Sequence, residues 1–314
     1  MIKRAHASED PASSRTADLL AALAPDEGYN MTSLAELRVL RAGRPQPRMP
    51  VLHGPGILLV AQGRKRDYLA DEASESDAQH YRMLTLTLPF VCEIEATEDE
   101  PLLAAHLRLD PVLMTELLRE TDPRGAELPA PQARIAATMD EHMRTSLQRL
   151  LEVAGDATES RVLGRSLLRE IFFRALNGAQ GPLLRASLIG KGRFGDVARA
   201  LRLMVARHMQ PLTVARMAKE ADMSVPVFHV HFRTATGSSP LQYLKAIRLH
   251  RARMLMQRYG LSAVSASGQV GYESAPQFNR EFKRMFGMPP AEELQRIKRG
   301  GFALQPEEEI FIPS

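Results

Sequence analysis

The amino-acid sequence predicts an α+β protein, with a β-rich N-terminal part followed by an all-helical C-terminal part. Between residues 51 and 109, short apolar runs rich in Val, Leu, Ile and Thr alternate with glycines and prolines, which is typical of a small antiparallel sandwich or barrel. From residue 111 onward the apolar residues recur with the period of an α-helix. The charge divides in the same way, because residues 1–190 hold 22 Lys and Arg against 27 Asp and Glu, whereas residues 191–300 hold 19 against 7.

The composition narrows the possible classes of protein. A chain of 314 residues is long enough for two domains with separate cores, and 44% hydrophobic and 25% charged residues are ordinary for a globular protein. The single cysteine, Cys92, excludes an internal disulfide bond and a multi-cysteine zinc site. No early apolar stretch resembles a signal peptide or a membrane span, so we expect a cytoplasmic protein. The basic C-terminal part favours a polyanion as its partner, because basic clusters gain affinity by releasing counterions from phosphates.

The N-terminal part should begin with a short helix over residues 16–24 and continue as strands. The expected strands are the runs ILLVAQG, RKRDYL, YRMLTLTLPFVCEIE and LLAAHLRL, which cover residues 57–63, 64–69, 81–95 and 102–109. The basic residues Arg64, Lys65 and Arg66 would keep an edge strand soluble, with the binding of an anionic effector as the alternative. Cys92 is expected to be an inert core residue, with the sensing of an aldehyde or an oxidant as the alternative.

Three helices should follow the strands, over residues 111–120, 135–154 and 158–178. The third has a broad apolar face, formed by Val162, Leu163, Leu167, Ile171, Phe172 and Leu176. This face would either pack on the protein's own sandwich or form a dimer interface, and the sequence leaves both open. Residues 179–193 then contain several glycines and a proline, which is typical of a linker.

A segment of the C-terminal part occurs twice. Residues 274–290 align with residues 224–240 at an offset of fifty, with seven matches in one register. The matched pairs are Ser224 and Ser274, Pro226 and Pro276, Phe228 and Phe278, Phe232 and Phe282, Arg233 and Lys283, Gly237 and Gly287, and Pro240 and Pro290. Serine N-caps, core aromatics and terminating glycines in register predict one structural unit used twice. Each unit follows another short helical stretch, so the repeat predicts two helix-turn-helix motifs.

One long helix should join the two units over residues 239–260. Its basic residues Lys245, Arg248, Arg251 and Arg258 would form a regular basic face. A rigid connecting helix would fix the separation of the units, so that both could enter successive major grooves about 34 Å apart.

The stretches SPLQYLKAIRLHRAR, VGYES and FNREFKRMFGMPP resemble the AraC/XylS family of transcription regulators. The resemblance implies an AraC-type DNA-binding domain over residues 194–299, between the linker and an acidic tail over residues 300–314. The segments LLVAQGRKRDYL and LPFVCEIEATEDEP resemble the cupin-like domain of one subgroup, which implies an effector or dimerisation domain with a helical extension over residues 1–178. The implied partners are double-stranded promoter DNA, RNA polymerase, a second copy of the chain and a small-molecule effector. No cofactor and no enzymatic activity are implied.

The resemblance also implies which residues read bases. On the second recognition helix they are Ala275, Pro276, Asn279 and Arg280, and on the first they are Val225, Pro226, His229 and Val230. Chemistry supports Arg280 and Asn279 most strongly, because Arg pairs with guanine and Asn with adenine through two hydrogen bonds each. The first helix departs from the family pattern, since Val230 offers no hydrogen bond. The positions best suited to phosphate contacts are Arg233, Lys245, Gln277 and Lys283.

The alternative is a metal-dependent cupin enzyme with an accessory nucleic-acid-binding module. It has little support, because His53, His80 and His106 are widely spaced and lack a metal-binding motif. His229 and His231 are two residues apart on a helix, so their side chains diverge and could not share one ion.

A further departure from the family pattern is Gly268 in the helix before the second recognition helix. In the interior of a helix, glycine should lower stability by roughly 1 kcal/mol relative to alanine.

Overall fold

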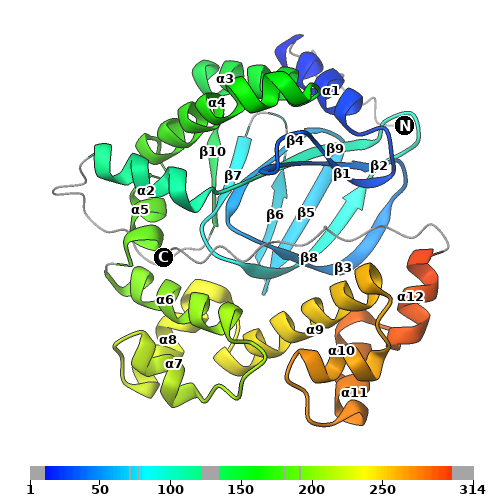
Figure 1. The fold of residues 1–314 in the computed structure, drawn as a ribbon, viewed down its shortest axis with the longest axis vertical. Coiled ribbons are helices and arrows are strands. Elements are labelled where there is room, and N and C mark those ends of the chain that lie inside the picture. Colours follow the sequence, from blue (N-terminus) through cyan, green and yellow to red (C-terminus); the bar gives the residue numbers. More distant parts are fainter. Residues whose placement is uncertain are drawn as a thin grey trace, which may run out of the picture.

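The computed structural model describes residues 11–70, 72–76, 78, 80–121, 134–179, 181–190 and 192–298. A β-sandwich with helices on one side forms the N-terminal part, and helices alone form the C-terminal part (Figure 1). The α+β fold class is therefore confirmed. None of the described helices is long and apolar enough to cross a membrane.

The sandwich consists of two antiparallel sheets. The six-stranded sheet has the order β1 (Gly28–Met31), β2 (Leu37–Ala42), β9 (Leu102–Arg108), β4 (Gly56–Gln62), β7 (His80–Leu84) and β10 (Arg134–Thr138). The four-stranded sheet has the order β3 (Gln46–His53), β8 (Leu88–Glu95), β5 (Arg64–Leu69) and β6 (Glu72–Ser76). The expected run over residues 81–95 is thus two strands, and β7 and β8 belong to different sheets.

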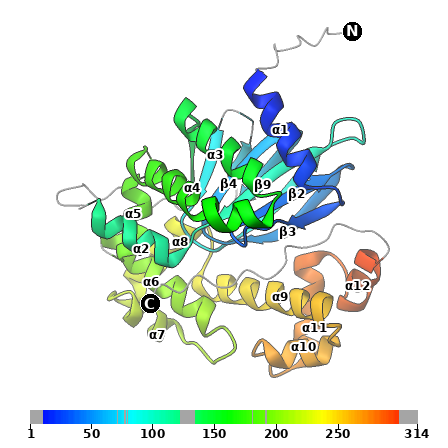
Figure 2. The ribbon, with the colours of Figure 1, turned by 45° about the horizontal axis from the view of Figure 1, so that its top comes forward.

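Side chains alternate between the two faces of the six-stranded sheet. Leu37, Ile57 and Met83 point outward into a core that they share with four helices. These helices are α1 (Pro11–Leu23), α2 (Pro111–Glu120), α3 (Glu141–Val153) and α4 (Ala157–Asn177), and they lie over this face in Figures 1 and 2. Leu40 and Val60 point inward, toward the second sheet.

Most of the predicted apolar face of helix α4 is buried within the N-terminal part. Leu167, Ile171 and Phe172 are buried in the same core as the sheet, which confirms packing on the protein's own sandwich for these residues. Val162 and Leu163, by contrast, are 68% and 45% exposed.

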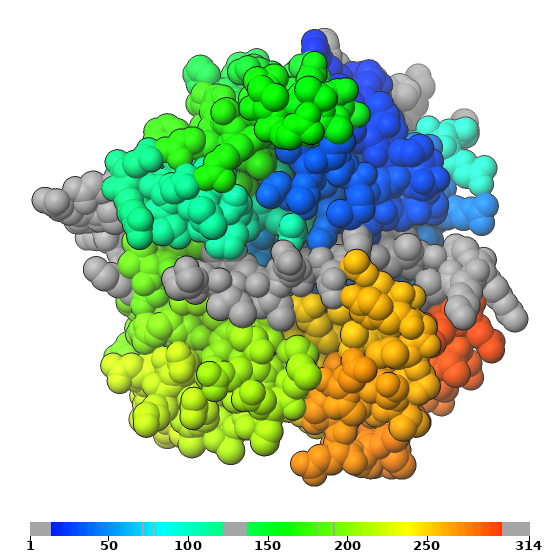
Figure 3. Space-filling model, in the orientation of Figure 1, coloured from blue at the N-terminus to red at the C-terminus, as the bar shows by residue number. Residues whose placement is uncertain are grey.

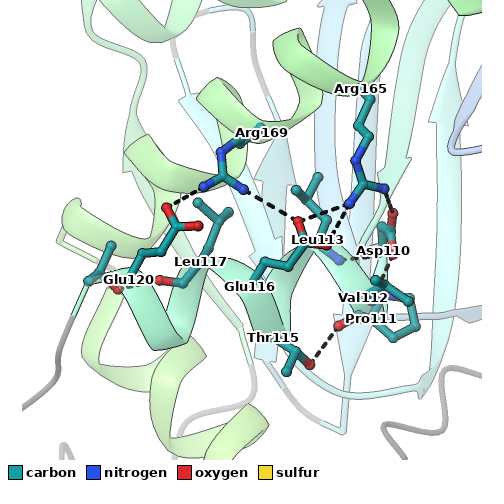
Figure 4. A network of polar contacts seen from close by, with 11 residues as sticks. Asp110, Pro111, Val112, Leu113, Thr115, Glu116, Leu117, Glu120, Arg165 and Arg169 are labelled. Carbon is teal, nitrogen blue, oxygen red and sulfur yellow. Dashed lines mark hydrogen bonds and ion pairs between the residues drawn. The ribbon is translucent and has the colours of Figure 1, made fainter.

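A network of ion pairs also joins α4 to α2 (Figure 4). Arg165 Nη2 donates to both oxygens of Glu116, at 2.8 and 2.9 Å, and Arg169 contacts Glu116 and Glu120. Asp110 begins α2 by accepting from the backbone N–H of Val112 at 2.8 Å.

Residues 135–154 do not form one helix, so this prediction was wrong. The first residues pair with β7 as strand β10, and α3 begins only after Asp140. Asp140 is the N-cap of α3 and accepts from the backbone N–H of Met143 at 2.7 Å. Pairing with a distant strand therefore overrides the local helical pattern.

The basic stretch at Arg64, Lys65 and Arg66 is not on an edge strand, which corrects the preferred interpretation. Strand β5 lies between β8 and β6. Lys65 points into the sandwich and is 1% exposed, whereas Arg66 points outward and pairs with Glu95 at 2.7 Å. Alternation along the strand gives these neighbouring cations opposite environments.

The glycine-rich stretch expected as a linker contains helix α5 (Gly181–Ile189). Its Leu183, Leu184 and Ala186 are buried, and Ser187 Oγ donates to the carbonyl of Thr85 at 2.9 Å. The stretch between the two parts is therefore a packed helix over these residues, because its apolar side chains find partners that the glycine content does not reveal.

Seven helices follow, arranged as two lobes with a long helix between them. They are α6 (Gly192–Ala206), α7 (Val214–Glu220), α8 (Val225–Thr236), α9 (Pro240–Tyr259), α10 (Ala263–Gln269), α11 (Ala275–Phe286) and α12 (Pro290–Lys298). Figure 3 shows the two lobes side by side, yellow-green for α6 and α7 and orange for α10 and α11. The tail expected over residues 300–314 lies outside the described residues.

Candidate nucleic-acid interface

The two repeated units have the same construction. Each has a 7-residue helix, α7 or α10, followed by a turn and a 12-residue helix, α8 or α11. Both 12-residue helices carry proline in the first turn and end at a left-handed glycine, Gly237 with φ 69° and Gly287 with φ 80°. The prediction of one unit used twice is therefore confirmed at the level of structure.

The turns are closed by matching backbone hydrogen bonds. The N–H of Met223 donates to the carbonyl of Ala218 at 3.0 Å, and the N–H of Tyr272 donates to that of Ser267 at 3.0 Å. The second turn is one residue longer, since five residues separate α10 from α11 and four separate α7 from α8. Both serines stand at the predicted N-caps, but only Ser274 accepts a capping hydrogen bond with its side chain, from the N–H of Gln277, and Ser224 makes none.

Each recognition helix buries its aromatic stripe. Phe228 and Phe232 on α8, and Phe278 and Phe282 on α11, have no exposed surface. The rings of each pair lie 5.2 and 5.5 Å apart between centroids. Because this face is buried in the core, the opposite face of each helix is available to solvent or a ligand.

That opposite face carries the predicted base readers. On α11, Pro276, Asn279 and Arg280 are exposed and Ala275 is partly buried. On α8, the exposed set is Val225, Pro226, His229 and Val230. The outer surface of α8 is thus largely apolar, and Val230 alone is 65% exposed. Each recognition helix brings its four predicted residues together on one side, with chemistry that differs between the two.

The predicted phosphate contacts fall into two groups. Arg233 and Lys283 are exposed on the last turns of α8 and α11. Lys245 and Gln277 both reach Glu281 instead, with Lys245 Nζ donating at 2.7 Å and Gln277 Nε2 at 3.3 Å. A phosphate would have to compete with this carboxylate for them.

Glu281 is the residue that sequence reasoning missed at this surface. It also accepts from Tyr272 Oη at 2.7 Å, so it ties α11 to α9 and to the preceding turn. Burial alone would raise the pKa of Glu281, but hydrogen bonds from Lys245, Tyr272 and Gln277 hold that pKa below its usual value. No spacing rule links Glu281 to Lys245, which is 36 residues away.

The connecting helix α9 begins with a capping box at Ser239 and Gln242 and spans about 30 Å for its 20 residues. Its predicted basic face is not continuous. Arg248 donates to the carbonyls of His208 and Gln210, at 2.7 and 2.9 Å, and so braces the segment before α7. The helix is buried on several sides, because it packs against both lobes and against β3 and β8.

The N-terminal part places the other candidate residues inside the sandwich. Burial raises the pKa of the Cys92 thiol to about 11, so it stays protonated at neutral pH, which favours the inert interpretation. His53 and His106 are buried with their ring centroids 6.1 Å apart, and His80 begins β7. Among the described residues, no group of three His, Cys, Asp or Glu side chains could hold a metal ion.

Comparison with known proteins gives matches for both parts of the chain. Residues 33–183 match the family model of the AraC-type transcriptional regulator N-terminus, and residues 217–296 match that of a helix-turn-helix domain. The activator RclR of Escherichia coli is 36% identical over 113 residues, which are 36% of this chain and 39% of RclR. A probable thc operon regulatory protein of Rhodococcus erythropolis is 31% identical over 106 residues, which are 33% of this chain and 32% of that protein. These curated relatives are therefore matched over about a third of their length.

Solved structures extend the likeness of fold to both parts. ToxT of Vibrio cholerae, crystallised with an unsaturated fatty acid, superposes with a TM-score of 0.58 at 12% identity, over 82% of this chain and 94% of ToxT. At that identity the match shows the fold alone. The two family models, together with the curated regulators that match, show that this chain belongs to the AraC family of transcription regulators, as its motifs predict.

Proposed function

We propose that this chain binds promoter DNA sequence-specifically and regulates transcription, with α8 and α11 in successive major grooves. The observation that carries the proposal is the duplicated unit, in which buried phenylalanines force Asn279 and Arg280 to the outside. The length of α9, about 30 Å, is close to the pitch of B-DNA, about 34 Å. Two curated relatives are named as an operon regulatory protein and a transcriptional activator, which supports the same conclusion.

The two recognition helices would contribute differently to DNA binding. Arg280 would read guanine and Asn279 adenine, each through two hydrogen bonds. The apolar surface of α8 would contact thymine methyl groups or read shape, and His229 is its one exposed polar candidate among the predicted four. Arg233 and Lys283 would position the protein on phosphates, and Lys245 and Gln277 would do so once released from Glu281.

The N-terminal domain would control this activity through a small-molecule effector, through dimerisation, or through both. The fatty acid in the ToxT crystal supports a small molecule, since ToxT shares this fold. The exposed Val162 and Leu163 of α4 fit a contact with a second copy of the chain. We further propose a cytoplasmic location and RNA polymerase as a partner at the promoter.

Base reading can be separated from backbone contact by comparing Arg280→Ala with Lys283→Ala. Genome-wide mapping of bound DNA supplies the operator, and binding is then measured on operator and random duplexes over a range of salt. Arg280→Ala should weaken operator binding by about 1–3 kcal/mol and random DNA far less. Lys283→Ala, the matched control on the same helix, should weaken both alike and reduce the salt slope by about one. If Arg280→Ala lost the same affinity for both duplexes, Arg280 would be assigned to a contact with the DNA backbone.

A further inference from the structure

The first recognition helix, α8, places a valine where the second, α11, places an arginine. Val230 stands two residues after the buried Phe228 and two residues before the buried Phe232. Two residues on an α-helix correspond to a rotation of about 200°, so Val230 projects from the side opposite both rings. Arg280 stands in the same relation to two buried phenylalanines of α11. The repeated unit therefore puts these two side chains at equivalent places.

Val230 belongs to an apolar reading face, which we define as Val225, Pro226 and Val230. Val230 is 65% exposed, Val225 is 38% exposed, and Pro226 is exposed as well. The neighbouring polar side chains add few hydrogen bonds. The Thr234 hydroxyl donates to the carbonyl of Val230 at 3.0 Å, within the helix, and His229 is the one polar residue among the four predicted base readers of α8. The apolar reading face therefore offers methyl groups to whatever it contacts.

The unit that carries this face exposes more cations than acids. Between residues 214 and 236 the exposed cations are Arg216, Lys219 and Arg233, and the exposed acids are Glu220 and Asp222. An apolar face on a unit with exposed cations fits a major groove, because phosphate backbones form both edges of the groove. The equivalence of α8 and α11 makes duplex DNA the occupant that both helices share, and this step rests on the proposed function.

The major groove presents one apolar group to such a face, which is the C5 methyl group of thymine. The other groups on the base edges are hydrogen-bond donors and acceptors. A valine pressed against them displaces water and returns no hydrogen bond, which is unfavourable. Contact with a methyl group instead buries apolar surface on both partners, which is favourable. Readout of a narrow minor groove relies on inserted cations, whereas the one Lys or Arg of α8 is Arg233 in its last turn.

We propose that the apolar reading face of α8 recognises the C5 methyl group of a pyrimidine, so that thymine and 5-methylcytosine are equivalent ligands for Val230. The two bases carry the same methyl group and differ beside it, where thymine has the O4 acceptor and cytosine the N4 donor. A valine forms a hydrogen bond with neither group, so it does not distinguish the two bases. Methylation of a cytosine at this position therefore strengthens binding, and operator recognition responds to cytosine methylation in the half that α8 contacts.

The test begins with the full-length protein and a pool of random DNA duplexes, from which the tightest-binding duplex is recovered. Each thymine of that duplex is then replaced singly by uracil, which lacks only the methyl group. At least one replacement should weaken binding about fourfold, which corresponds to about 0.8 kcal/mol for one buried methyl group. At the same position, 5-methylcytosine should bind about fourfold more tightly than cytosine. Equal affinities for cytosine and 5-methylcytosine there would overturn the proposal.

Substitutions in the protein locate the contact. Val230→Ala should bind the thymine and uracil duplexes with equal affinity, because the side chain that touches the methyl group is shortened. Val264→Ala is the matched control, since Val264 of α10 is 67% exposed and lies outside both recognition helices. It should keep the wild-type ratio of the two affinities. A wild-type ratio in both Val230→Ala and Val225→Ala would place the methyl contact outside α8 and reject the assignment.

The same experiment separates this inference from the proposed function. If the pool yields no duplex that binds better than random DNA, the proposed function fails, and the methyl readout fails with it. If a duplex is recovered and every thymine can be replaced by uracil without loss, only the methyl readout fails. Arg280→Ala should weaken binding of the recovered duplex but keep the ratio between its thymine and uracil forms. Loss of that ratio in Arg280→Ala would assign the methyl contact to α11 and overturn the proposal for α8.

Discussion

His250 on α9 illustrates how a buried neutral histidine couples stability to pH. The ring is 6% exposed and packs edge-on against Phe286, with 5.3 Å between centroids. Burial lowers its pKa from the ordinary 6.5 to about 3, and the charges of Arg253 and Arg251 act in the same direction. The unfolded chain therefore takes up this proton near pH 6.5, and the folded chain only near pH 3. Stability from the neutral ring is complete above about pH 6.5 and is lost as the pH falls toward 3.

We predict that His250→Leu reduces the acid sensitivity of the protein. A buried neutral histidine lowers the free energy of unfolding by about 1.4 kcal/mol for each pH unit below its pKa in the unfolded chain. Over two pH units the loss is about 3 kcal/mol. The measurement is the free energy of unfolding in urea at a series of pH values. The variant should lose less stability than the wild type between neutral and mildly acidic pH, by about that amount. Parallel pH profiles for the two proteins would contradict the prediction.

The residues of the candidate site were predictable where one helix decides their environment. The recurrence of Phe278, Phe282 and Phe286 every four residues places Asn279 and Arg280 on the outside, and both are exposed. The environments of Lys245 and Arg253 were not predictable, because their partners come from other elements. Arg253, 2% exposed, pairs with Glu293 of α12 and lies over the Phe286 ring, and nothing in its local pattern distinguishes it from a surface arginine.

At the scale of the element, α10 offers two glycines with opposite roles. Gly268 lies in the last turn of the helix, and a β-carbon built on it would meet nothing within 4 Å. Gly271 follows the helix with φ +84°, and a β-carbon there would lie 2.4 Å from the carbonyl oxygen of Met209. The first glycine only weakens the helix, whereas the second is required by the turn.

Alanine substitution should therefore have opposite effects at these positions. Gly268→Ala should raise the free energy of unfolding by about 0.4–1 kcal/mol and leave operator affinity unchanged. Gly271→Ala should lower it by more than 1 kcal/mol, because it adds both a left-handed strain and a clash with backbone (about 1–2 kcal/mol for the strain alone). Thermal unfolding of the two variants tests the pair. An unchanged stability for Gly268→Ala would remove the claim that this helix is locally weak.

Elements were predictable from sequence where local pattern and tertiary contact agree. The run PVLMTELLRE is α2 over its whole length, because Asp110 and Pro111 mark its start and Leu113, Met114 and Leu117 form its buried side. Residues 135–138 were wrongly predicted as part of a helix, and residues 181–189 form a helix within the expected linker. In both, a distant surface supplies the decisive partner: β7 for strand β10, and the hydrogen bond to Thr85 with the surrounding core for α5.

At the scale of the whole molecule, the sandwich and the helical part share one of the buried apolar clusters. Leu84, Leu88 and Phe90 belong to the same buried cluster as Phe232 of α8 and Tyr243 of α9. The Tyr243 hydroxyl also donates to the carbonyl of Thr87, between β7 and β8, at 2.7 Å. Domains joined by a large apolar interface move together, unlike domains joined by small polar ones. The charge asymmetry of the sequence indicates two parts but contains no sign of this shared cluster.

We therefore predict that the chain unfolds in a single cooperative transition in scanning calorimetry. Tyr243→Phe keeps the ring but leaves the Thr87 carbonyl without this donor, so it should lower the free energy of unfolding by about 0.5–1.5 kcal/mol. Tyr259→Phe, at a ring that is 54% exposed near the end of α9, is the matched control and should change little. If calorimetry resolved two transitions and Tyr243→Phe lowered the melting temperature of only one of them, the two parts would unfold independently. Thr87 joins a strand of each sheet, so in a cooperative molecule a loss at Tyr243 must destabilise the sandwich as much as the DNA-binding helices.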